Sequence, residues 1–346
     1  MKIQKKKNLT FLNTFKVHAI ADFFAEITSE QELEEALDYA SARSIPFEII
    51  GGGSNILFAQ DFKGMVIRIR NKGILWDKVK DSDKQKVVAS AGEDWHKFVT
   101  RCLEKNLYGL ENLALIPGTV GGAPIQNIGA YGVEVEEFIL GVKVFDVIEK
   151  KWICIERRNC GFGYRSSIFK TSNRFIIFNV IFELVRNWEP RLNHKELSAK
   201  FVSRKATASV VFDEICKLRN KKLPDPSVIG NAGSFFKNPI IPINEFEKLK
   251  TIFPEIPFYE TEKSGFLKIP AAWLLDYLGW KGKTLEGASV SPKHALIIIN
   301  SGNASGKNIL DLAKKMSSSV LDNFGIMLVP EVRIIGVNSN LLHPTQ

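Results

Sequence analysis

The first predicted element is an amphipathic helix over residues 28–44. Four apolar residues recur there at helical spacing: Leu33, Ala36, Leu37 and Ala40. Ser29 precedes Glu32 by three residues, which is the pattern of a capping box at a helix N-terminus. The apolar run 47–50 then predicts a strand, and this strand ends directly at Gly51. The pattern therefore predicts a helix, a strand and a glycine-rich loop in succession.

The rest of the chain mixes strands with helices. Apolar runs and period-two alternation predict strands over 64–70, 86–90, 140–147, 151–155, 175–184, 295–300 and 328–335. Helical spacing predicts helices over 93–105, 206–220, 271–278 and 305–324. The succession of strands between 140 and 184 favours a largely antiparallel sheet. The predicted fold class is therefore α+β.

Two glycine-rich segments interrupt these elements. The first, GGGSN at 51–55, either makes a simple turn or lets bare backbone N–H groups approach a pyrophosphate. It lacks the third glycine of the standard dinucleotide motif, and the GKT at 282–284 lacks the upstream glycine of a phosphate-binding loop. The second, IPGTVGGAPIQNIGAYG at 116–132, is too rich in glycine and proline for regular structure. Loops of this length inside compact domains are usually functional.

Composition narrows the class of protein. The chain has 346 residues, which predicts two or three domains, and its 45% apolar and 25% charged residues are typical of a folded globular protein. The apolar runs are too short for membrane helices, and no signal-peptide core follows the N-terminal lysines. Four dispersed cysteines without a CxxC pair predict reduced structural thiols and no metal site. We expect a cytoplasmic protein.

The net charge of +9 indicates anionic partners. Nucleic acid, phosphorylated cofactors and acidic substrates all meet this condition. A non-enzymatic protein that binds nucleic acid or nucleotides is thus one interpretation, but no recognition helix, zinc module or RNA-binding signature accompanies the charge. We expect no nucleic-acid partner.

Six sequence blocks resemble one enzyme family, the UDP-N-acetylenolpyruvoylglucosamine reductases, often called MurB. The blocks are IIGGGSNILF (49–58), GLENLALIPGTVGGAPIQNIGAYG (109–132), CGFGYRSSIFK (160–170), KLPDP (222–226), GNAGSFFKNP (230–239) and VPEVRIIG (329–336). They occur in order and span about residues 13–336. Such a set is far more specific than any single glycine pattern.

The resemblance implies an α+β fold with a flavin-binding domain of the vanillyl-alcohol-oxidase or PCMH type, followed by a smaller α+β substrate-binding domain. We expect the FAD-binding domain at 14–187, an insertion or linker at 188–221 and the substrate-binding domain at 222–338. The implied reaction is the reduction of UDP-N-acetylglucosamine enolpyruvate to UDP-N-acetylmuramate, with noncovalent FAD and with NADPH as hydride donor. The sequence leaves open the preference for NADPH over NADH and the oligomeric state, for which a monomer is our expectation.

The resemblance also implies which residues hold the flavin. They lie in the two glycine-rich segments: Gly51, Gly52, Gly53, Ser54, Asn55, Ile56, Pro117, Gly118, Thr119, Gly121, Gly122, Gln126, Asn127, Gly129, Ala130 and Tyr131. Glycine at these positions would let the backbone approach the cofactor.

Three matched positions are implied to carry the chemistry. Hydride addition to the enolpyruvyl double bond places negative charge on the neighbouring carbon and its carboxylate. Arg165 would bind the carboxylate, and a protonated Glu331 would donate a hydrogen bond to the developing charge. Ser234 would deliver the proton, directly or through water. The ordinary structural alternatives are a surface ion pair for Arg165, a turn or cap for Ser234 and a solvent-facing strand residue for Glu331.

Substrate contacts are implied at three further positions. Lys222 and Asn238 match residues that contact the diphosphate of the substrate. In family members with the longer insertion, which this chain resembles, a tyrosine there closes over that diphosphate. His194 stands at the comparable place, where it is either a lid residue or a solvated loop histidine. The rival enzymatic interpretation is a flavin-dependent alcohol or sugar oxidase of the same fold.

Overall fold

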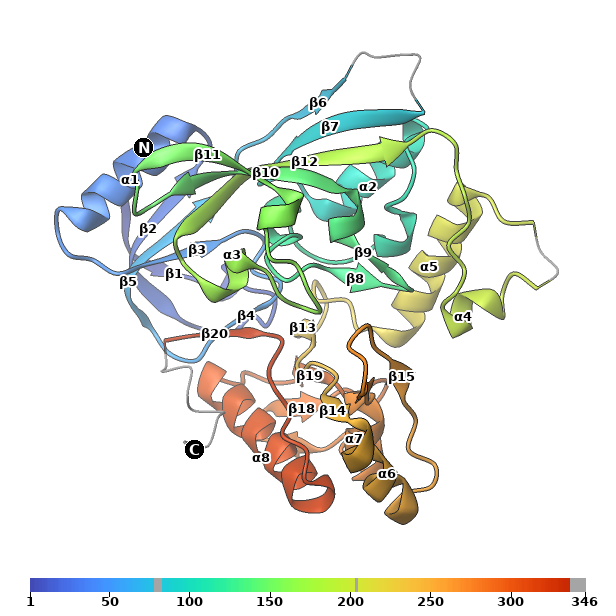
Figure 1. Ribbon diagram of the computed structural model, residues 1–346. Helices are drawn as coiled ribbons and strands as arrows, with labels where there is room; N and C mark the ends of the chain where they lie inside the picture. Colours follow the sequence, from blue (N-terminus) through green and yellow to red (C-terminus); the bar gives the residue numbers. More distant parts are fainter. Residues whose placement is uncertain (78–82, 203–204, 337–346) are drawn as a thin grey trace. The chain divides into compact units, whose positions relative to one another are not determined.

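The computed structural model describes residues 1–77, 83–202 and 205–336. The chain forms two compact units (Figure 1), and their segments interleave along the sequence. The first unit comprises 1–6, 22–53 and 64–221, and the second comprises 7–21, 54–63 and 222–346. Residues 203–204 of the predicted insertion and 337–338 of the predicted substrate domain lie outside the described residues.

A four-stranded sheet, most of which belongs to the first unit, carries the first glycine-rich segment. Its strand order is β1 (Gln4–Asn8), β2 (Ile20–Ile27), β5 (Phe62–Ile69) and β3 (Phe47–Ile50). Strands β3 and β5 are parallel, with Ile49 opposite Ile67. The preceding helix α1 (Glu30–Ser41) begins as predicted, because the Ser29 side chain accepts a hydrogen bond from the backbone N–H of Glu32 at 3.2 Å.

A five-stranded antiparallel sheet forms the rest of the core of the first unit. Its order is β11 (Lys151–Glu156), β10 (Ile139–Asp146), β12 (Phe175–Val185), β7 (Lys84–Ser90) and β6 (Ile74–Trp76). The central strands place their inward residues in register, with Val142 opposite Val180 and Phe182 opposite Val87, and these side chains are fully buried. The antiparallel sheet predicted from the sequence is therefore confirmed.

Helix α2 (Trp95–Glu104) packs one face into the same core. The rings of Phe98 and Phe182 lie 5.0 Å apart between centroids. Cys102 is buried on this face, and burial raises the pKa of its thiol. The cysteines of the chain are free, in agreement with the prediction of reduced structural thiols.

A smaller apolar cluster lies under helix α5 (Ala208–Lys222). It joins Val211 and Ile215 of α5 to Leu197 of the short helix α4 (Lys195–Ser198). Two short strands, β8 (Gly129–Ala130) and β9 (Val133–Glu134), pair within the second glycine-rich segment, and α3 (Ile168–Thr171) precedes β12. The predicted insertion or linker at 188–221 thus contains α4, a single helical turn that buries Leu197, and most of α5.

The second unit has its own sheets and helices. Its elements form a sheet ordered β13 (Gly230–Ser234), β19 (Ile297–Asn300), β18 (Ala288–Val290) and β17 (Thr284–Leu285), a sheet ordered β14 (Ile240–Pro242), β16 (Phe266–Lys268) and β15 (Tyr259–Glu260), and the pair β20 (Arg333–Ile335) and β4 (Ile56–Phe58). The helices are α6 (Ile243–Ile252), α7 (Ala271–Tyr277) and α8 (Gly306–Phe324).

The N-terminal segment 7–21 belongs to the second unit because its backbone bonds there. The backbone N–H of Asn231 donates to the Thr14 carbonyl at 2.9 Å, and the Asn300 side chain donates to the Phe15 carbonyl at 3.0 Å. Strand β4 pairs in parallel with β20, with Leu57 opposite Ile334. The predicted FAD-binding domain, 14–187, is one continuous segment, whereas these long-range bonds draw 14–21 and 54–63 into the second unit.

The structure contains several elements that the sequence pattern did not predict. Strand β2 and helix α6 are two of them. The predicted strand 328–335 is regular only over β20, although Pro330 forms an isolated bridge with Phe236. A proline has no N–H to donate to a ladder, which explains the interruption.

Candidate active site

The first glycine-rich segment packs against the second within the first unit. A Cβ atom added to Gly51 would lie 2.5 Å from Oγ1 of Thr119, and one added to Gly52 would lie 3.1 Å from Cα of Gly118. Side chains at 51 and 52 would therefore push the two loops apart. The glycines allow two loop backbones to meet, which makes this place suited to a ligand that binds through backbone N–H groups, as a pyrophosphate does.

The second segment is held in place by the residues 91–95 that lead into α2. The backbone N–H of Trp95 donates to the Gly118 carbonyl at 3.1 Å, and those of Val120 and Gly121 donate to Glu93 and Ala91 at 2.9 Å. These bonds fix residues 118–121 on the core of the sheet. The arrangement fits the predicted cofactor positions in 51–53 and 117–122.

His96 supports the same segment one residue into α2. Its Nδ1 accepts a hydrogen bond from the backbone N–H of Leu115 at 3.1 Å. Leu115 has a φ of 55°, a left-handed conformation that is strained for leucine. The His96 ring stacks on Phe212 of α5, with centroids 5.5 Å apart. Sequence analysis missed His96, because a single histidine on a helix carries no signal of the backbone group it meets.

Burial lowers the pKa of His96, and the charge of Arg219 lowers it further, against the opposing effect of Asp94. The neutral imidazole can accept at Nδ1 only with its proton on Nε2. The hydrogen bond to Leu115 therefore requires the neutral form that burial favours.

The second half of the segment is held by buried polar contacts. Asn127 is fully buried, and its Nδ2 donates to the carboxylates of Glu134 at 2.7 Å and Glu136 at 3.0 Å. Its Oδ1 accepts from the backbone N–H of Glu136 at 3.1 Å. Because the chain's own groups engage this side chain, a cofactor contact at Asn127 would come from its backbone.

Arg165 lies beside this half of the segment. Its Nη2 donates to the carbonyl of Gly129 at 2.8 Å and its Nη1 to that of Asn127 at 3.4 Å, while Glu134 lies 4.0 Å away. The Arg165 side chain is 18% exposed, so its ion pair with Glu134 is partly buried. Arg165 joins the GYR turn to the predicted cofactor segment.

In the second unit, backbone pairing brings the segments of Ser234 and Glu331 together. Ser234 ends β13, and the next residue, Phe235, accepts a hydrogen bond at its carbonyl from the backbone N–H of Glu331 at 2.8 Å. The Asn55 side chain donates to the Glu331 carbonyl at 3.3 Å, and the Asn55 carbonyl accepts from Arg333 at 3.0 Å. Residues 54–56 of the first block therefore support the Glu331 segment within this unit.

The predicted substrate residues occupy defined positions. Lys222 is the last residue of α5. Asn238 accepts at Oδ1 from the backbone N–H of Ala271, the first residue of α7, at 3.0 Å. His194 caps α4, and its ring meets the edge of the Tyr131 ring at 5.1 Å between centroids. His194 thus contacts the second glycine-rich segment.

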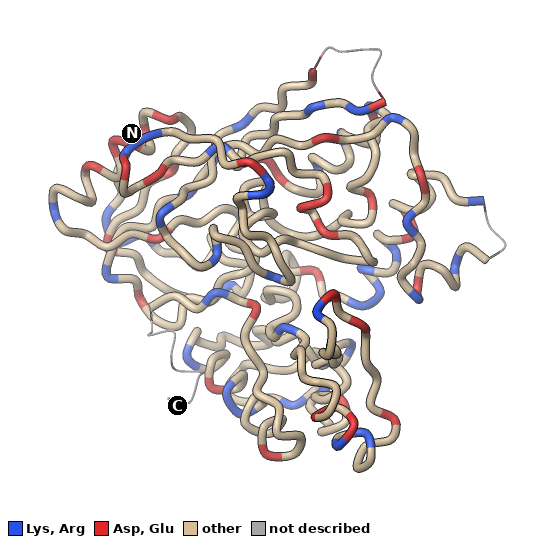
Figure 2. Tube along the Cα trace, viewed as in Figure 1, with Lys and Arg blue, Asp and Glu red and all other residues tan. Residues whose placement is uncertain are grey.

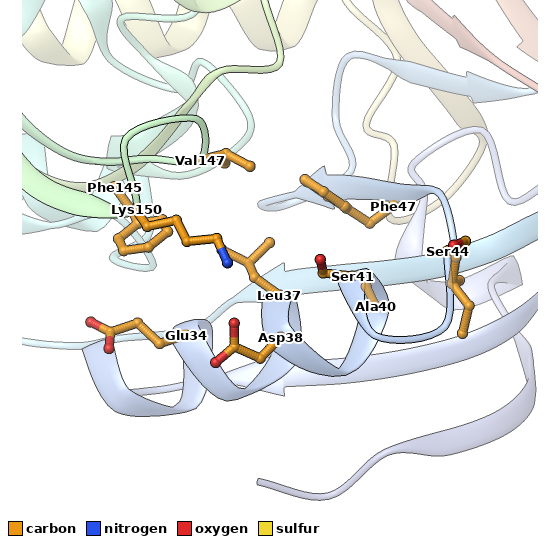
Figure 3. A pocket seen from close by; sticks show the side chains of 11 residues that line it. Glu34, Leu37, Asp38, Ala40, Ser41, Ser44, Phe47, Phe145, Val147 and Lys150 are labelled. Carbon is orange, nitrogen blue, oxygen red and sulfur yellow. The ribbon is translucent and has the colours of Figure 1, made fainter.

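A cavity of about 450 Å³ in the first unit contains none of the predicted site residues (Figure 3). Its lining comes from α1 and the turn after it, from Phe47 at the start of β3, and from the end of β10 with the turn that follows. The glycine-rich loop follows the other end of β3. The cavity is therefore separate from the loops that fit a cofactor.

The described residues contain no group of three or more His, Cys, Asp or Glu side chains placed to hold a metal ion. In the part of the chain that the structure describes, no helix has both the length and the apolar character needed to cross a bilayer. Lys and Arg residues alternate with Asp and Glu along both units (Figure 2), so the net positive charge is spread along the chain.

Comparison with known proteins identifies the class and then the family. Residues 21–148 match the FAD binding domain, so the protein is an α+β flavoprotein. Residues 225–335 match the C-terminal domain of UDP-N-acetylenolpyruvoylglucosamine reductase. The chain belongs to the UDP-N-acetylenolpyruvoylglucosamine reductase family.

Individual relatives support this membership over nearly the whole chain. The UDP-N-acetylenolpyruvoylglucosamine reductase of Haemophilus ducreyi is 43% identical over 326 residues, 94% of this chain and 94% of the relative. That of Pseudoalteromonas atlantica is 42% identical over 339 residues, 97% of this chain and 96% of the relative. The family resemblance found in the sequence is confirmed.

A solved structure shares the fold. The UDP-N-acetylenolpyruvylglucosamine reductase (MurB) from Thermus caldophilus superposes with a TM-score of 0.65 at 22% identity, over 96% of this chain and 98% of that one. At this identity the match shows the fold alone. The predicted fold class, with its FAD-binding domain, is confirmed.

We predict that Gly51→Ala weakens FAD binding roughly 5- to 150-fold, the effect of about 1–3 kcal/mol of overpacking. The new Cβ would lie 2.5 Å from Thr119 Oγ1 but 3.6 Å from Thr119 Cβ. In titrations of the flavin-free protein, Gly51→Ala should therefore weaken binding less when Thr119→Ala is already present than it does in the wild-type background. Gly302→Ala, where no atom lies within 4 Å of the added Cβ, is the control. Unchanged affinity in Gly51→Ala would contradict the packing argument.

We also predict that His96 makes FAD binding depend on pH. Its pKa lies below the ordinary 6.5 in the folded protein, so the stabilisation is complete above 6.5 and is lost as the pH falls through the lowered pKa. Titrations from about pH 8 to about pH 5.5 should show weaker FAD binding at the acid end. His96→Asn keeps an acceptor that does not titrate, so its profile should be flatter; identical profiles would refute the role.

Proposed function

We propose that the chain reduces UDP-N-acetylglucosamine enolpyruvate to UDP-N-acetylmuramate, a precursor of peptidoglycan, with FAD as cofactor and NADPH as hydride donor. The observation that carries this proposal is identity above 40% to reductases of this name over nearly the whole chain. The chain is an oxidoreductase of cell-wall synthesis. We propose that it acts in the cytoplasm, as its free cysteines favour, and as a monomer.

We propose that FAD is held without a covalent bond by the segment 14–187. The contact between the loops 51–53 and 117–122 supports this, because it presents bare backbone and leaves little room for side chains. Neither glycine-rich block contains a His or Cys that could attach the flavin. When bound, FAD accepts hydride from NADPH and supplies it to the enolpyruvyl double bond.

Arg165 would bind the carboxylate of the enolpyruvyl group. Its position against the Gly129 carbonyl supports a role next to the cofactor segment, and its guanidinium carries a permanent charge in a planar fork. The bonds to Gly129 and Asn127 would also fix the direction of this fork. Arg165 would thereby stabilise the negative charge that hydride addition places on the carboxylate.

Ser234 and Glu331 would act on the same charge from the second domain, 222–338. Ser234 would donate a proton to the carbon next to the one that receives hydride, and a protonated Glu331 would donate a hydrogen bond to the developing enolate. The bond between the Glu331 N–H and the Phe235 carbonyl supports this pairing, since it joins their segments. Asn55 would keep the Glu331 segment in place.

Lys222 and Asn238 would bind the diphosphate of the UDP-sugar. The ammonium group of Lys222 supplies charge, and the side-chain amide of Asn238, whose Oδ1 accepts from Ala271, can donate from its nitrogen to a phosphate oxygen. His194, which contacts Tyr131, would close over the ligand from the segment 188–221. Imidazole can donate to a phosphate oxygen as a tyrosine hydroxyl does.

The function is tested by incubating the purified protein with NADPH and UDP-N-acetylglucosamine enolpyruvate. Mass spectrometry should detect a product that has gained one hydride and one proton, in step with the NADPH consumed and without oxygen. Rapid oxygen consumption with peroxide release and no change in the enolpyruvyl compound would instead identify the rival oxidase.

We predict that Ser234→Ala separates the two half-reactions. Reduction of the flavin by NADPH should survive, because it needs no proton donor to substrate carbon. Reoxidation by the enolpyruvyl substrate should slow roughly 10²- to 10⁴-fold, the range of general acid catalysis. Ser264→Ala, at an exposed serine of the same unit, should change neither rate. If Ser234→Ala keeps the wild-type reoxidation rate, the proton comes from another group.

A further inference from the structure

The cavity in Figure 3 lies outside the site described above and combines apolar walls with charged edges. Its volume of about 450 Å³ is within the range of small-molecule sites. Leu37 and Ala40 of α1 and Phe145 of β10 line it, and all three belong to the hydrophobic core of the first unit. Phe47 at the start of β3 adds a second aromatic ring to the lining. The cavity therefore offers apolar contact to a ligand of modest size.

Charges of both signs stand at the edge of this cavity. Glu34 and Asp38 come from α1, and Lys150 comes from the turn that follows β10. In Figure 3 the Lys150 side chain extends toward the helix side chains Leu37 and Asp38. The three charged residues are exposed, so they are ionised at neutral pH and can be reached by a ligand that enters from solvent.

Lys150 and Asp38 do not pair with each other. Over residues 1–77, 83–202 and 205–336, neither side chain forms a hydrogen bond, or an ion pair within 4.0 Å. Neighbouring charges are engaged: Lys151 lies 3.7 Å from Glu149, and Glu34 accepts a hydrogen bond from the Trp152 indole at 2.6 Å. Lys150 and Asp38 thus keep opposite charges available at one cavity.

Two residues of the lining hold a backbone conformation that favours glycine. Ser44, in the turn after α1, has a φ of 51°, and Lys150 has a φ of 50°. Glycine would adopt this conformation with less strain but would remove a side chain from the cavity. Strained residues that keep their side chains are frequent at ligand sites. The backbone at Lys150 therefore agrees with a use for its ammonium group.

We propose that this cavity binds a small zwitterion with an apolar body, which is the chemistry of an apolar amino acid. The ammonium group of the ligand would lie against Asp38 and its carboxylate against Lys150. Its apolar side chain would contact Leu37, Phe47 and Phe145, where an aromatic ring finds aromatic partners. A simple amine or a simple acid would leave one of the two charges of the cavity unmatched, so the zwitterion is favoured over both.

The test compares three ligands by ligand-observed NMR titration of the FAD-loaded protein. They are L-phenylalanine and two analogues, 2-phenylethylamine, which lacks the carboxylate, and 3-phenylpropionate, which lacks the ammonium group. L-Phenylalanine should bind more tightly than either analogue. Asp38→Asn should weaken binding of L-phenylalanine and 2-phenylethylamine roughly 2- to 5-fold, the range of an exposed ion pair, and spare 3-phenylpropionate. Lys150→Met should weaken binding of L-phenylalanine and 3-phenylpropionate by a similar factor and spare 2-phenylethylamine.

Two further variants assign the binding to this cavity. Ser41→Phe, at an exposed position of α1 that lines the cavity, should fill it and weaken binding of all three ligands roughly 10-fold or more. Lys151→Met removes the neighbouring lysine, which is paired with Glu149, and should change none of the affinities. Equal FAD content in every variant shows that the fold is intact.

Three results would overturn the proposal. One is that L-phenylalanine fails to bind more tightly than both analogues. Another is that Asp38→Asn and Lys150→Met change the three affinities alike. The third is that Ser41→Phe leaves binding unchanged, which would place the ligand elsewhere on the protein. The proposal goes beyond the proposed function and does not depend on it, because these titrations require no turnover.

Discussion

The backbone contact between the two glycine-rich loops is the constraint on which the first unit depends. Gly51 and Gly52 meet Thr119 and Gly118 at distances that exclude a Cβ atom without displacement. Strand β3, which pairs in parallel with β5, leads into one loop, and the residues 91–95 that lead into α2 hold the other by three backbone hydrogen bonds. The antiparallel sheet beneath α2 is thus the support for a cofactor-binding surface made of backbone.

In the second unit, main-chain contacts likewise hold the segments that would carry the proposed chemistry. Strand β13 pairs with β19 and then continues as a chain that meets residues 329–331, so the segments of Ser234 and Glu331 are joined by main-chain hydrogen bonds. Asn55, which follows the first glycine-rich loop, bonds to both Glu331 and Arg333. One sequence block therefore serves both units, with Gly51–Gly53 in the first and Ser54–Asn55 in the second.

Local signals in the sequence predicted the local structure. The Ser29 cap, strand β3 and the alternating strands β10 to β12 follow from rules that act within a few residues. The family blocks gave candidate positions but not their neighbours. The bond of His96 to strained Leu115 depends on contact between two segments that the pattern does not connect. Periodicity carries no information about such contacts. For the same reason, the sequence pattern did not show that residues 14–21 belong to the second unit.

The central claim is that one cofactor site accepts hydride from NADPH and a separate set of residues completes the reduction of the enolpyruvyl substrate. Anaerobic stopped-flow absorbance of the wild-type protein tests it directly. NADPH should bleach the flavin, and UDP-N-acetylglucosamine enolpyruvate mixed with the reduced protein should restore the oxidised spectrum at least as fast as steady-state turnover. A reduced flavin that ignores this substrate and is reoxidised only by oxygen would contradict the account.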